Sequence, residues 1–143
     1  MDTCTRGWNA DSGPMLLSGA RSLTEKAFRH TDIPAVRCSA TSFGARAGMG
    51  SAKLADFVLA VSEAAACATG QGLCTARLRL WTTGARAFCE IHGDCRVLRQ
   101  EPDGSRPDDA EKMRRWLLQQ VCDHVRLESG PDGVTVSFSI AVT

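Results

Sequence analysis

Apolar residues recur at helical spacing in the stretch Leu54–Ala68, LADFVLAVSEAAACA. This spacing predicts a long helix with one continuous buried face, because side chains three and four positions apart share a face. The predicted inward residues are Leu54, Phe57, Val58, Val61, Ala65 and Ala68. We expect Ser51 to cap this helix and Thr69-Gly70 to end it, since glycine supplies the left-handed turn that follows a helix.

Glu63 and Cys67 lie four residues apart in this helix and therefore on the same face. From periodicity alone, Glu63 fits a solvent-facing acid as well as it fits a functional carboxylate. Cys67 is typical of a small buried side chain rather than a reactive thiol. The choice between these alternatives depends on the rest of the chain.

The N-terminal part of the chain shows little periodicity. We expect residues 1–23 to form a flexible arm and residues 24–143 to form one domain. Thr24–His30 predicts a short strand, although its alternation is poor. Asp32 precedes Ile33-Pro34 at a first helical turn, where the missing proline N–H costs nothing. The inward residues of that helix, which should end at Gly48-Met49-Gly50, are predicted to be Val36, Ala40, Phe43 and Ala47.

After Gly72 the period changes to two, which is typical of strands. We predict a hairpin of Cys74–Thr82 and Ala85–His92, a long loop over Gly93–Asp108, and a closing hairpin of Val125–Glu128 and Val134–Val142. A third helix is expected over Ala110–His124. Its predicted inner stripe is Met113, Trp116, Leu117, Gln120 and Val121, with Lys112, Arg114, Arg115 and Gln119 facing out.

The resulting order is strand, helix, helix, strand, strand, helix, strand, strand. Runs of helices and strands, instead of strict alternation, favour an α+β fold. We therefore predict a two-layer sandwich in which a mixed, mostly antiparallel sheet is covered on one face by about three helices.

Composition adds few constraints. A formal net charge of +1 gives no electrostatic argument for direct binding of nucleic acid or of an anionic membrane. No run approaches the roughly 20 apolar residues that a membrane span needs, and no signal peptide is evident. The chain has seven cysteines, scattered through apolar segments. Free thiols in a reducing cytoplasm are the expected state.

Three further features allow more than one functional interpretation. Cys89, His92 and Cys95 offer ligands that zinc prefers, but residues 89 and 92 face opposite sides of a strand and no fourth ligand is evident. A cysteine nucleophile paired with His30, His92 or His124 has no motif behind it. Trp81, on the outer face of the predicted sheet, fits a partner surface as well as a stack under Arg79.

The order of elements, with VSEAAACA on the second helix and WLLQQVCDHVRLESGPDGVTVSFSI at the end, resembles one family. It is similar to the anti-sigma factor and serine-kinase branch of the GHKL ATPases. The resemblance covers roughly Glu25–Val142. It implies the GHKL (histidine-kinase-like) ATPase fold.

The resemblance also implies where a nucleotide would bind, and this chain departs from the pattern there. The family's Glu-x-x-x-Asn box places its catalytic glutamate at Glu63 and its magnesium-binding asparagine at Cys67, where a thiol is a poor ligand for a hard cation. The aspartate that reads adenine falls on Gly93, and Asp94 matches only with a one-residue shift. The glycine-rich phosphate turn is replaced by Glu111–Arg115, whose cations Lys112, Arg114 and Arg115 are also typical of a solvated helix face.

The expectation is therefore an anti-sigma-type regulator that binds a sigma factor or an anti-anti-sigma-like protein through its first two helices and the adjacent sheet edge. No cofactor is expected, and a homodimer stays open. The alternative is an active serine-protein kinase that uses ATP and Mg, with Glu63 as general base and Asp94 as the adenine ligand. In that alternative the ATP-site positions are Glu63, Cys67, Gly93 and Asp94.

Overall fold

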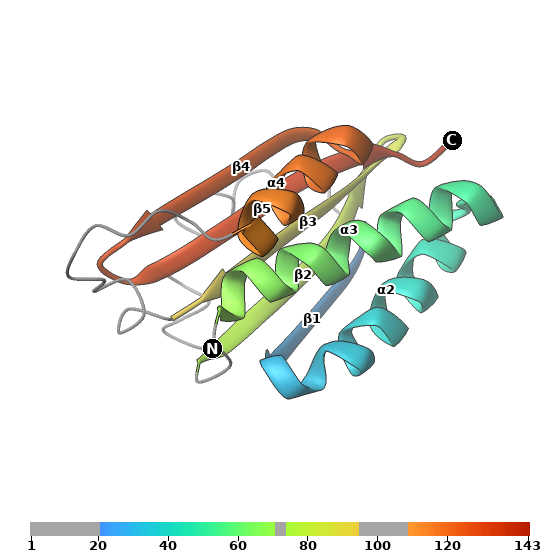
Figure 1. The fold of residues 1–143 in the computed structure, drawn as a ribbon. Helices are drawn as coiled ribbons and strands as arrows, with labels where there is room; N and C mark the ends of the chain where they lie inside the picture. The colour runs from blue at the N-terminus through green and yellow to red at the C-terminus, as the bar shows by residue number, and fades with distance from the viewer. Residues whose placement is uncertain (1–20, 71–73, 95–108) are drawn as a thin grey trace.

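The computed structural model describes residues 21–70, 74–94 and 109–143. Residues 1–20 of the predicted arm (1–23) and residues 95–108 of the predicted loop (93–108), with Cys95, lie outside the described residues. The elements follow one another as in Figure 1. Their bounds are β1 Arg21–Arg29, η1 His30–Asp32, α2 Ile33–Ala47, α3 Ser51–Thr69, β2 Thr75–Thr83, β3 Arg86–Gly93, α4 Asp109–Val121, β4 Asp123–Gly130 and β5 Gly133–Ala141.

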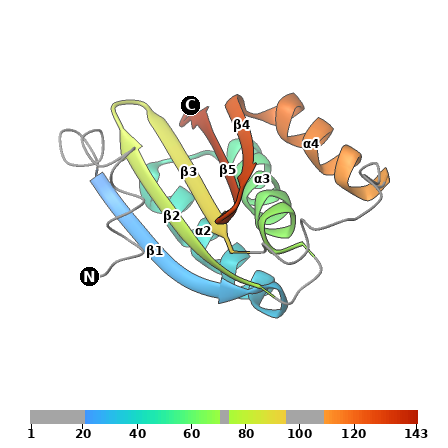
Figure 2. The same cartoon turned by 90° about the vertical axis from the view of Figure 1, so that its left-hand side faces the viewer.

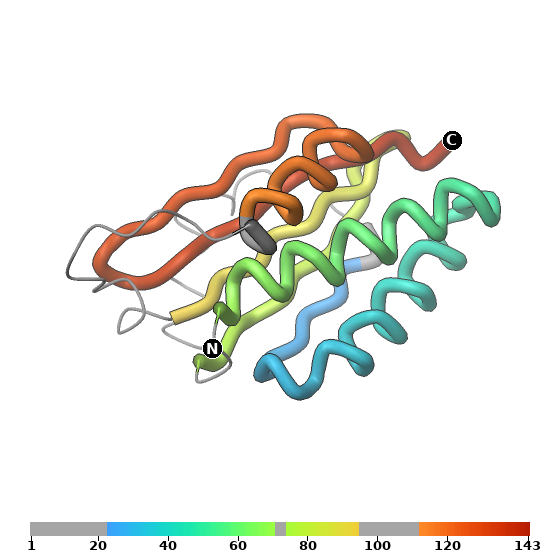
Figure 3. Tube along the Cα trace, viewed as in Figure 1, coloured from blue at the N-terminus to red at the C-terminus, as the bar shows by residue number. Residues whose placement is uncertain are grey.

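The strands form one sheet of five strands in the order β1-β2-β3-β5-β4. Helices α2, α3 and α4 cover one face of it, so the predicted α+β two-layer sandwich is confirmed (Figures 1 and 2). All pairings in this sheet are antiparallel, where a mixed sheet was expected. The connections explain this. The antiparallel pair α2 and α3 returns the chain to the end where β1 finished, so β2 runs back beside β1 (Figure 3).

The core lies between the helices and the inner face of the sheet. The period-two prediction is confirmed, because the alternate residues of β2, β3 and β5 that face the helices are buried. Phe57 of α3 stacks on Phe43 of α2 at a ring-centroid distance of 5.8 Å and meets Phe138 of β5 edge-on at 6.3 Å. Each such buried side chain contributes about 1.5–3 kcal/mol of transfer free energy, so these rings tie both helices to the sheet.

Some predicted boundaries shift. Arg21, Ser22 and Leu23 belong to β1 rather than to a flexible arm. Residue Gly50, with extended backbone, is the N-cap of α3, and Ser51 is its first helical residue without a side-chain cap bond. Gly48 has φ +93°, the left-handed conformation expected at the end of α2.

The prediction for α4 is wrong in two respects. The helix ends at Val121 instead of His124, because the chain reverses into β4 at His124, which has φ +53°. The inner stripe is also rotated. Met113 and Trp116 are 56% and 54% exposed, whereas Leu118 is 1% exposed. Leu118 and Cys122 lie one turn apart and point to the core, so the buried face is turned by one residue, about 100°, from the predicted one.

Candidate functional site

Glu63 lies half-buried on α3, on the side that faces α4. Its Oε1 atom is 3.6 Å from Nε of Arg114 on α4, so this carboxylate forms an ion pair between the two helices. Arg114 was predicted to face solvent, but it is half-buried and points toward α3. Cys67, one turn after Glu63, is also half-buried and is not part of a disulfide. The glutamate that the GHKL resemblance makes catalytic therefore has a cation as its neighbour.

Gly93 is the last residue of β3, and its backbone lies in close contact with the backbone of α3. A Cβ atom on Gly93 would clash with the carbonyl oxygen of Ala68, in the last turn of α3. A Cβ on Gly133, which has φ +126° at the start of β5, would clash in turn with the carbonyl oxygen of Gly93. Three main-chain segments thus stack in direct contact, and glycine is required at both positions. No side chain fits at position 93 unless α3 moves.

Asp94 follows directly and joins the ends of the β2–β3 hairpin. Its backbone N–H donates to the carbonyl oxygen of Thr75 at 3.1 Å. Its carboxylate accepts from the Thr75 backbone N–H at 3.2 Å and from the Thr75 hydroxyl at 3.3 Å. The side chain therefore turns back onto β2. It satisfies the first backbone donor of that strand.

The positions of Glu63, Cys67 and Gly93 can be compared with what a magnesium nucleotide needs from its site. Magnesium prefers an octahedron of oxygen ligands, and Cys67 offers sulfur where the resembled family has an amide oxygen. The Glu63 carboxylate is paired with Arg114, and position 93 has no room for an adenine-reading side chain. Within residues 21–70, 74–94 and 109–143, no group of three or more His, Cys, Asp or Glu side chains is placed to hold a metal ion. To a magnesium nucleotide these positions would offer one paired carboxylate, one thiol and no side chain at Gly93.

The zinc and nucleophile candidates are separated by the sheet. Cys89 is buried on the inner face, where desolvation above all raises its pKa well above the ordinary value. His92 lies on the opposite face, with Nδ1 2.8 Å from the Thr135 hydroxyl. His30 contacts the hydroxyl of Thr69 through Nδ1 at 3.0 Å. The third histidine, His124, is exposed on β4.

The cysteines differ in state. Cys38, Cys67, Cys89 and Cys122 take part in no disulfide, as expected, whereas Cys74 is disulfide-bonded. The expectation of free thiols is therefore wrong at Cys74. Burial, followed by the nearby carboxylates of Asp123 and Asp56, raises the pKa of the Cys122 thiol to about 12. This thiol stays protonated and unreactive at physiological pH.

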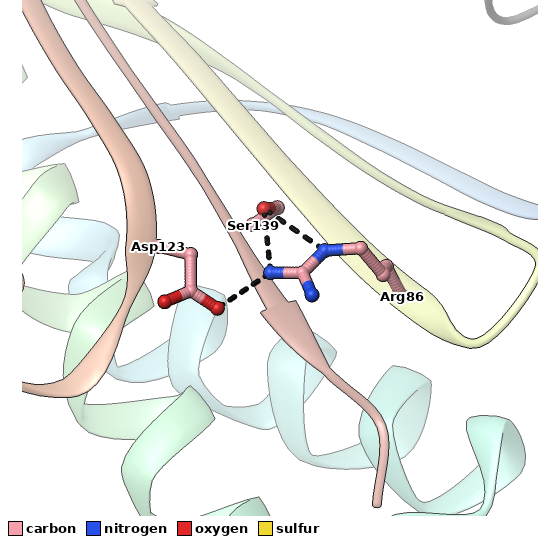
Figure 4. Close-up of polar contacts among 3 residues, drawn as sticks. All are labelled: Arg86, Asp123 and Ser139. Atoms are coloured by element: carbon pink, nitrogen blue, oxygen red, sulfur yellow. Dashed lines mark hydrogen bonds and ion pairs between the residues drawn. The ribbon is translucent and has the colours of Figure 1, made fainter.

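A polar cluster that the sequence analysis missed joins β3, β5 and β4 on the outer face (Figure 4). The Arg86 guanidinium donates to the Ser139 hydroxyl at 3.0 and 3.3 Å and to Asp123 Oδ2 at 2.6 Å. The hydrogen bond from Arg86 lowers the pKa of the Asp123 carboxyl below its ordinary value. Nothing local to Arg86 indicates this acid, because only the strand order β3-β5-β4 brings Asp123 beside it. These side-chain hydrogen bonds link the edge strand β4 to β5 and β3.

The outer surface of α4 has a different character. Met113 and Trp116 lie one turn apart and are more than half exposed. Lys112 and Arg115, next to them in sequence, are also exposed. We call these four residues the α4 patch: Lys112, Met113, Arg115 and Trp116. An exposed tryptophan and methionine flanked by cations are typical of a protein-binding surface.

Neither a protein-family model nor a curated protein sequence matches this chain. Among the helices that the structure describes, none has the length and apolar character needed to cross a membrane.

Proposed function

We propose that this chain is a cytoplasmic regulatory protein of the anti-sigma type, which acts by binding another protein and does not turn over nucleotide. The observation that carries this proposal is the closure of β3 on α3 at Gly93. The GHKL resemblance assigns an adenine-reading aspartate to that position. Main chain of Ala68 occupies the space which its side chain would need.

Two further contacts support the same proposal. A general base must be free to approach the proton that it takes from the substrate. Glu63 is instead paired with Arg114. Asp94, the substitute adenine ligand of the kinase alternative, already accepts hydrogen bonds from Thr75. Nucleotide chemistry would require both carboxylates to leave these partners.

Two surfaces suit a protein partner. One is the expected surface of α2, α3 and β1. Because β1 is an edge strand that ends the sheet, its outer side offers backbone groups for pairing, and Leu23 on it is exposed. The other is the α4 patch. Its aromatic and apolar side chains with flanking cations would suit an acidic helix or loop of a sigma factor or an anti-anti-sigma-like protein.

Two experiments test this function. The first is affinity capture from the native cytoplasm with the full chain and with its Trp116→Ala and Met113→Ala variants. We expect a sigma factor or a phosphorylatable antagonist to be captured by the full chain. Loss of at least tenfold in affinity is expected for the Trp116→Ala variant, because central aromatic residues dominate interface energetics. Gln119→Ala, also exposed on α4, is the matched control.

The second experiment distinguishes the kinase alternative. Thermal unfolding of the full chain is followed with and without Mg-ATP and Mg-ADP. A ligand that binds the native state must raise the midpoint, by mass action. We expect no shift at millimolar nucleotide. A shift that disappears in the Glu63→Ala or Asp94→Ala variant would establish the kinase alternative and overturn this proposal.

A further inference from the structure

Strand β4 forms one edge of the sheet and is well exposed. It stands last in the strand order, and within the described residues only β5 pairs with it (Figure 1). The side chains of Arg126 and Glu128 are 71% and 62% exposed, whereas Val125 and Leu127 are half-buried. Such an edge presents unpaired backbone N–H and C=O groups, which can pair with a further strand.

Two backbone hydrogen bonds just beyond the strand ends show which way the backbone groups of β5 point. Within an antiparallel sheet, successive residues direct N–H and C=O to the two neighbouring strands in turn. The Asp94 N–H donates to the Thr75 carbonyl oxygen at 3.1 Å, so even-numbered residues of β3 bond β2 and odd-numbered residues bond β5. The Val142 N–H donates to the Ala85 carbonyl oxygen at 2.8 Å, in agreement with this alternation. Even-numbered residues of β5 therefore bond β3, and its odd-numbered residues bond β4.

The register of β4 on β5 carries this alternation to the free edge. Arg126 and Glu128 lie opposite odd-numbered residues of β5, so their backbone groups bond that strand. Leu127 lies between them and directs its N–H and C=O away from the sheet, as does Ser129. A strand that pairs with the free edge of β4 must therefore form its hydrogen bonds at these two residues.

We propose that β4 pairs with β4 of a second copy of this chain, antiparallel and about a two-fold axis at Leu127. Leu127 then exchanges both of its outward-directed backbone groups with Leu127 of the second copy. Ser129 exchanges its own with Val125 of the second copy, and the two sheets become one continuous sheet. This inference goes beyond the proposed function and does not depend on it.

The charges of β4 are self-complementary in this pairing, which is why the occupant is a second copy. Arg126 and Glu128 project from the same face of the strand, where Nη2 of Arg126 is 2.8 Å from Oε2 of Glu128. Across the axis, Arg126 of each copy lies opposite Glu128 of the other, so unlike charges meet twice. Charged residues protect an edge strand from pairing when like charges meet, and here none do. On the other face, the half-buried Leu127 meets its own copy and loses apolar surface to water.

The two ends of β4 disfavour the other symmetric registers. The axis must pass through a residue whose backbone groups point outward, which limits it to Val125, Leu127 or Ser129. An axis at Ser129 would place Pro131 opposite Leu127, and proline has no N–H to donate. An axis at Val125 would fall in the first part of β4, where the register with β5 is irregular. The axis at Leu127 is the one that retains regular pairing on both sides.

The first test measures the dissociation constant of the dimer by sedimentation equilibrium of the full chain. We expect a dimer at micromolar concentration. Arg126→Glu brings acids opposite one another on both sides of the axis and should raise the dissociation constant at least tenfold, and Glu128→Arg should do the same with bases. The double variant should return the constant close to that of the unaltered chain. An equimolar mixture of the two single variants should also dimerise, because unlike charges face each other again.

Arg37→Glu, at an exposed arginine of α2, is the matched control and should leave the dissociation constant unchanged. A chain that is monomeric at every concentration would overturn the proposal and would leave this edge to a strand of another protein. A dimer that responds equally to Arg126→Glu and Arg37→Glu, or to neither, would place the interface elsewhere and would also overturn it.

A second test needs no substitution. Amide hydrogen exchange of the unaltered full chain is followed by NMR below and above the dissociation constant. We expect the N–H groups of Leu127 and Ser129 to exchange at least tenfold more slowly in the dimer, because the second copy accepts their hydrogen bonds. The N–H groups of Arg126 and Glu128 bond β5 and should be protected at both concentrations. Exchange at Leu127 that does not change with concentration would overturn the proposal.

Discussion

The junction of α3, β3 and β5 and the outer surface of α4 differ in whether their groups are already in contact with the rest of the fold. At the junction, the main chains of Ala68, Gly93 and Gly133 pack directly on one another, and Asp94 is bonded to Thr75. On α4, Met113 and Trp116 are exposed to solvent. The groups at the junction already contact other parts of the fold. The apolar side chains of α4 remain exposed and can contact a partner.

This difference indicates where ligand binding energy is available. A site that binds a small molecule needs space and polar groups that converge on it. At the junction, the space is filled by main chain and the carboxylates have partners. An exposed tryptophan gains free energy when a partner covers it, at about 25 cal/mol per Å² of apolar surface. This contrast supports the proposal that the chain binds another protein at α4.

The largest expected effect is at the junction itself. Gly93→Asp restores the residue type that the GHKL resemblance places there, and we expect it to lower the free energy of unfolding by about 4 kcal/mol, since the Cβ meets a backbone carbonyl. Urea unfolding measures this. The matched control is Gly50→Asp, because Gly50 has open space around its Cβ and is a helix N-cap, where aspartate is favourable. An unchanged midpoint for Gly93→Asp would show that the junction is open.

Next in size is a comparison of neighbours on α4. Leu118→Ala should cost about 3 kcal/mol, because it leaves a cavity between α4 and the core. Trp116→Ala should change stability by less than about 0.5 kcal/mol, because the indole is exposed. Thermal or urea unfolding of both variants measures the difference. A larger loss of stability for Trp116→Ala than for Leu118→Ala would show that Trp116 is buried, as the sequence predicted, and that the α4 patch does not exist.

A smaller effect is expected from alkaline pH. The pKa of the Cys122 thiol is raised by burial from 9.0 to about 12, and the pKa of Cys89 is raised as well. The unfolded chain loses these protons first, so stability is complete below pH 9 and falls as the pH rises toward 12. We expect a loss of about 1.4 kcal/mol from Cys122 by pH 10, and a further loss from Cys89. The chain has no tyrosine to obscure this titration.

Urea midpoints between pH 7 and 10.5 would measure that loss. Cys122→Ala should reduce the slope with pH, whereas Cys38→Ala, at an exposed free cysteine, should leave the slope unchanged. Equal slopes for all three proteins would contradict the buried, protonated state of Cys122.

The smallest expected effect concerns the ion pair between α3 and α4. Glu63 and Arg114 are partly exposed and 3.6 Å apart, so a double-mutant cycle with Glu63→Gln and Arg114→Gln should give a coupling of about 0.5 kcal/mol. Arg115→Gln, an exposed neighbour, should show none with Glu63. Coupling that is absent for Arg114, or equal for Arg115, would show that Glu63 is not held by this partner.

The layers of the fold could be predicted because the hydrophobic periods are strong in the relevant segments. Leu78, Leu80, Cys89 and Ile91 alternate cleanly, and Phe43 and Phe57 fall on helical stripes, so their burial follows from local pattern. In α4, apolar residues occupy two adjacent faces. The sequence alone does not distinguish a stripe through Met113 and Trp116 from one through Leu118 and Cys122. The packing of α4 against α3 and the sheet buries the stripe through Leu118 and Cys122.

The candidate site was less predictable, because its determining contacts join distant segments. Nothing local to Gly93 indicates that Ala68 and Gly133 press on it, and nothing local to Asp94 identifies Thr75 as its partner. From the sequence, Arg114 is typical of a solvent-exposed cation. Its ion pair with Glu63 follows from the orientation of α4 against α3. Trp81 was an open question for the same reason. Its ring partner is Phe88 on the adjacent strand.

A calorimetric titration of the full chain with Mg-ATP tests the central claim most directly. With the Gly93 junction closed and Glu63 and Asp94 engaged, we predict no saturable heat up to millimolar nucleotide, with or without magnesium. Micromolar binding that is lost in the Glu63→Ala or Asp94→Ala variant would contradict this prediction, because a nucleotide would then occupy the space that the main chain of Ala68 fills.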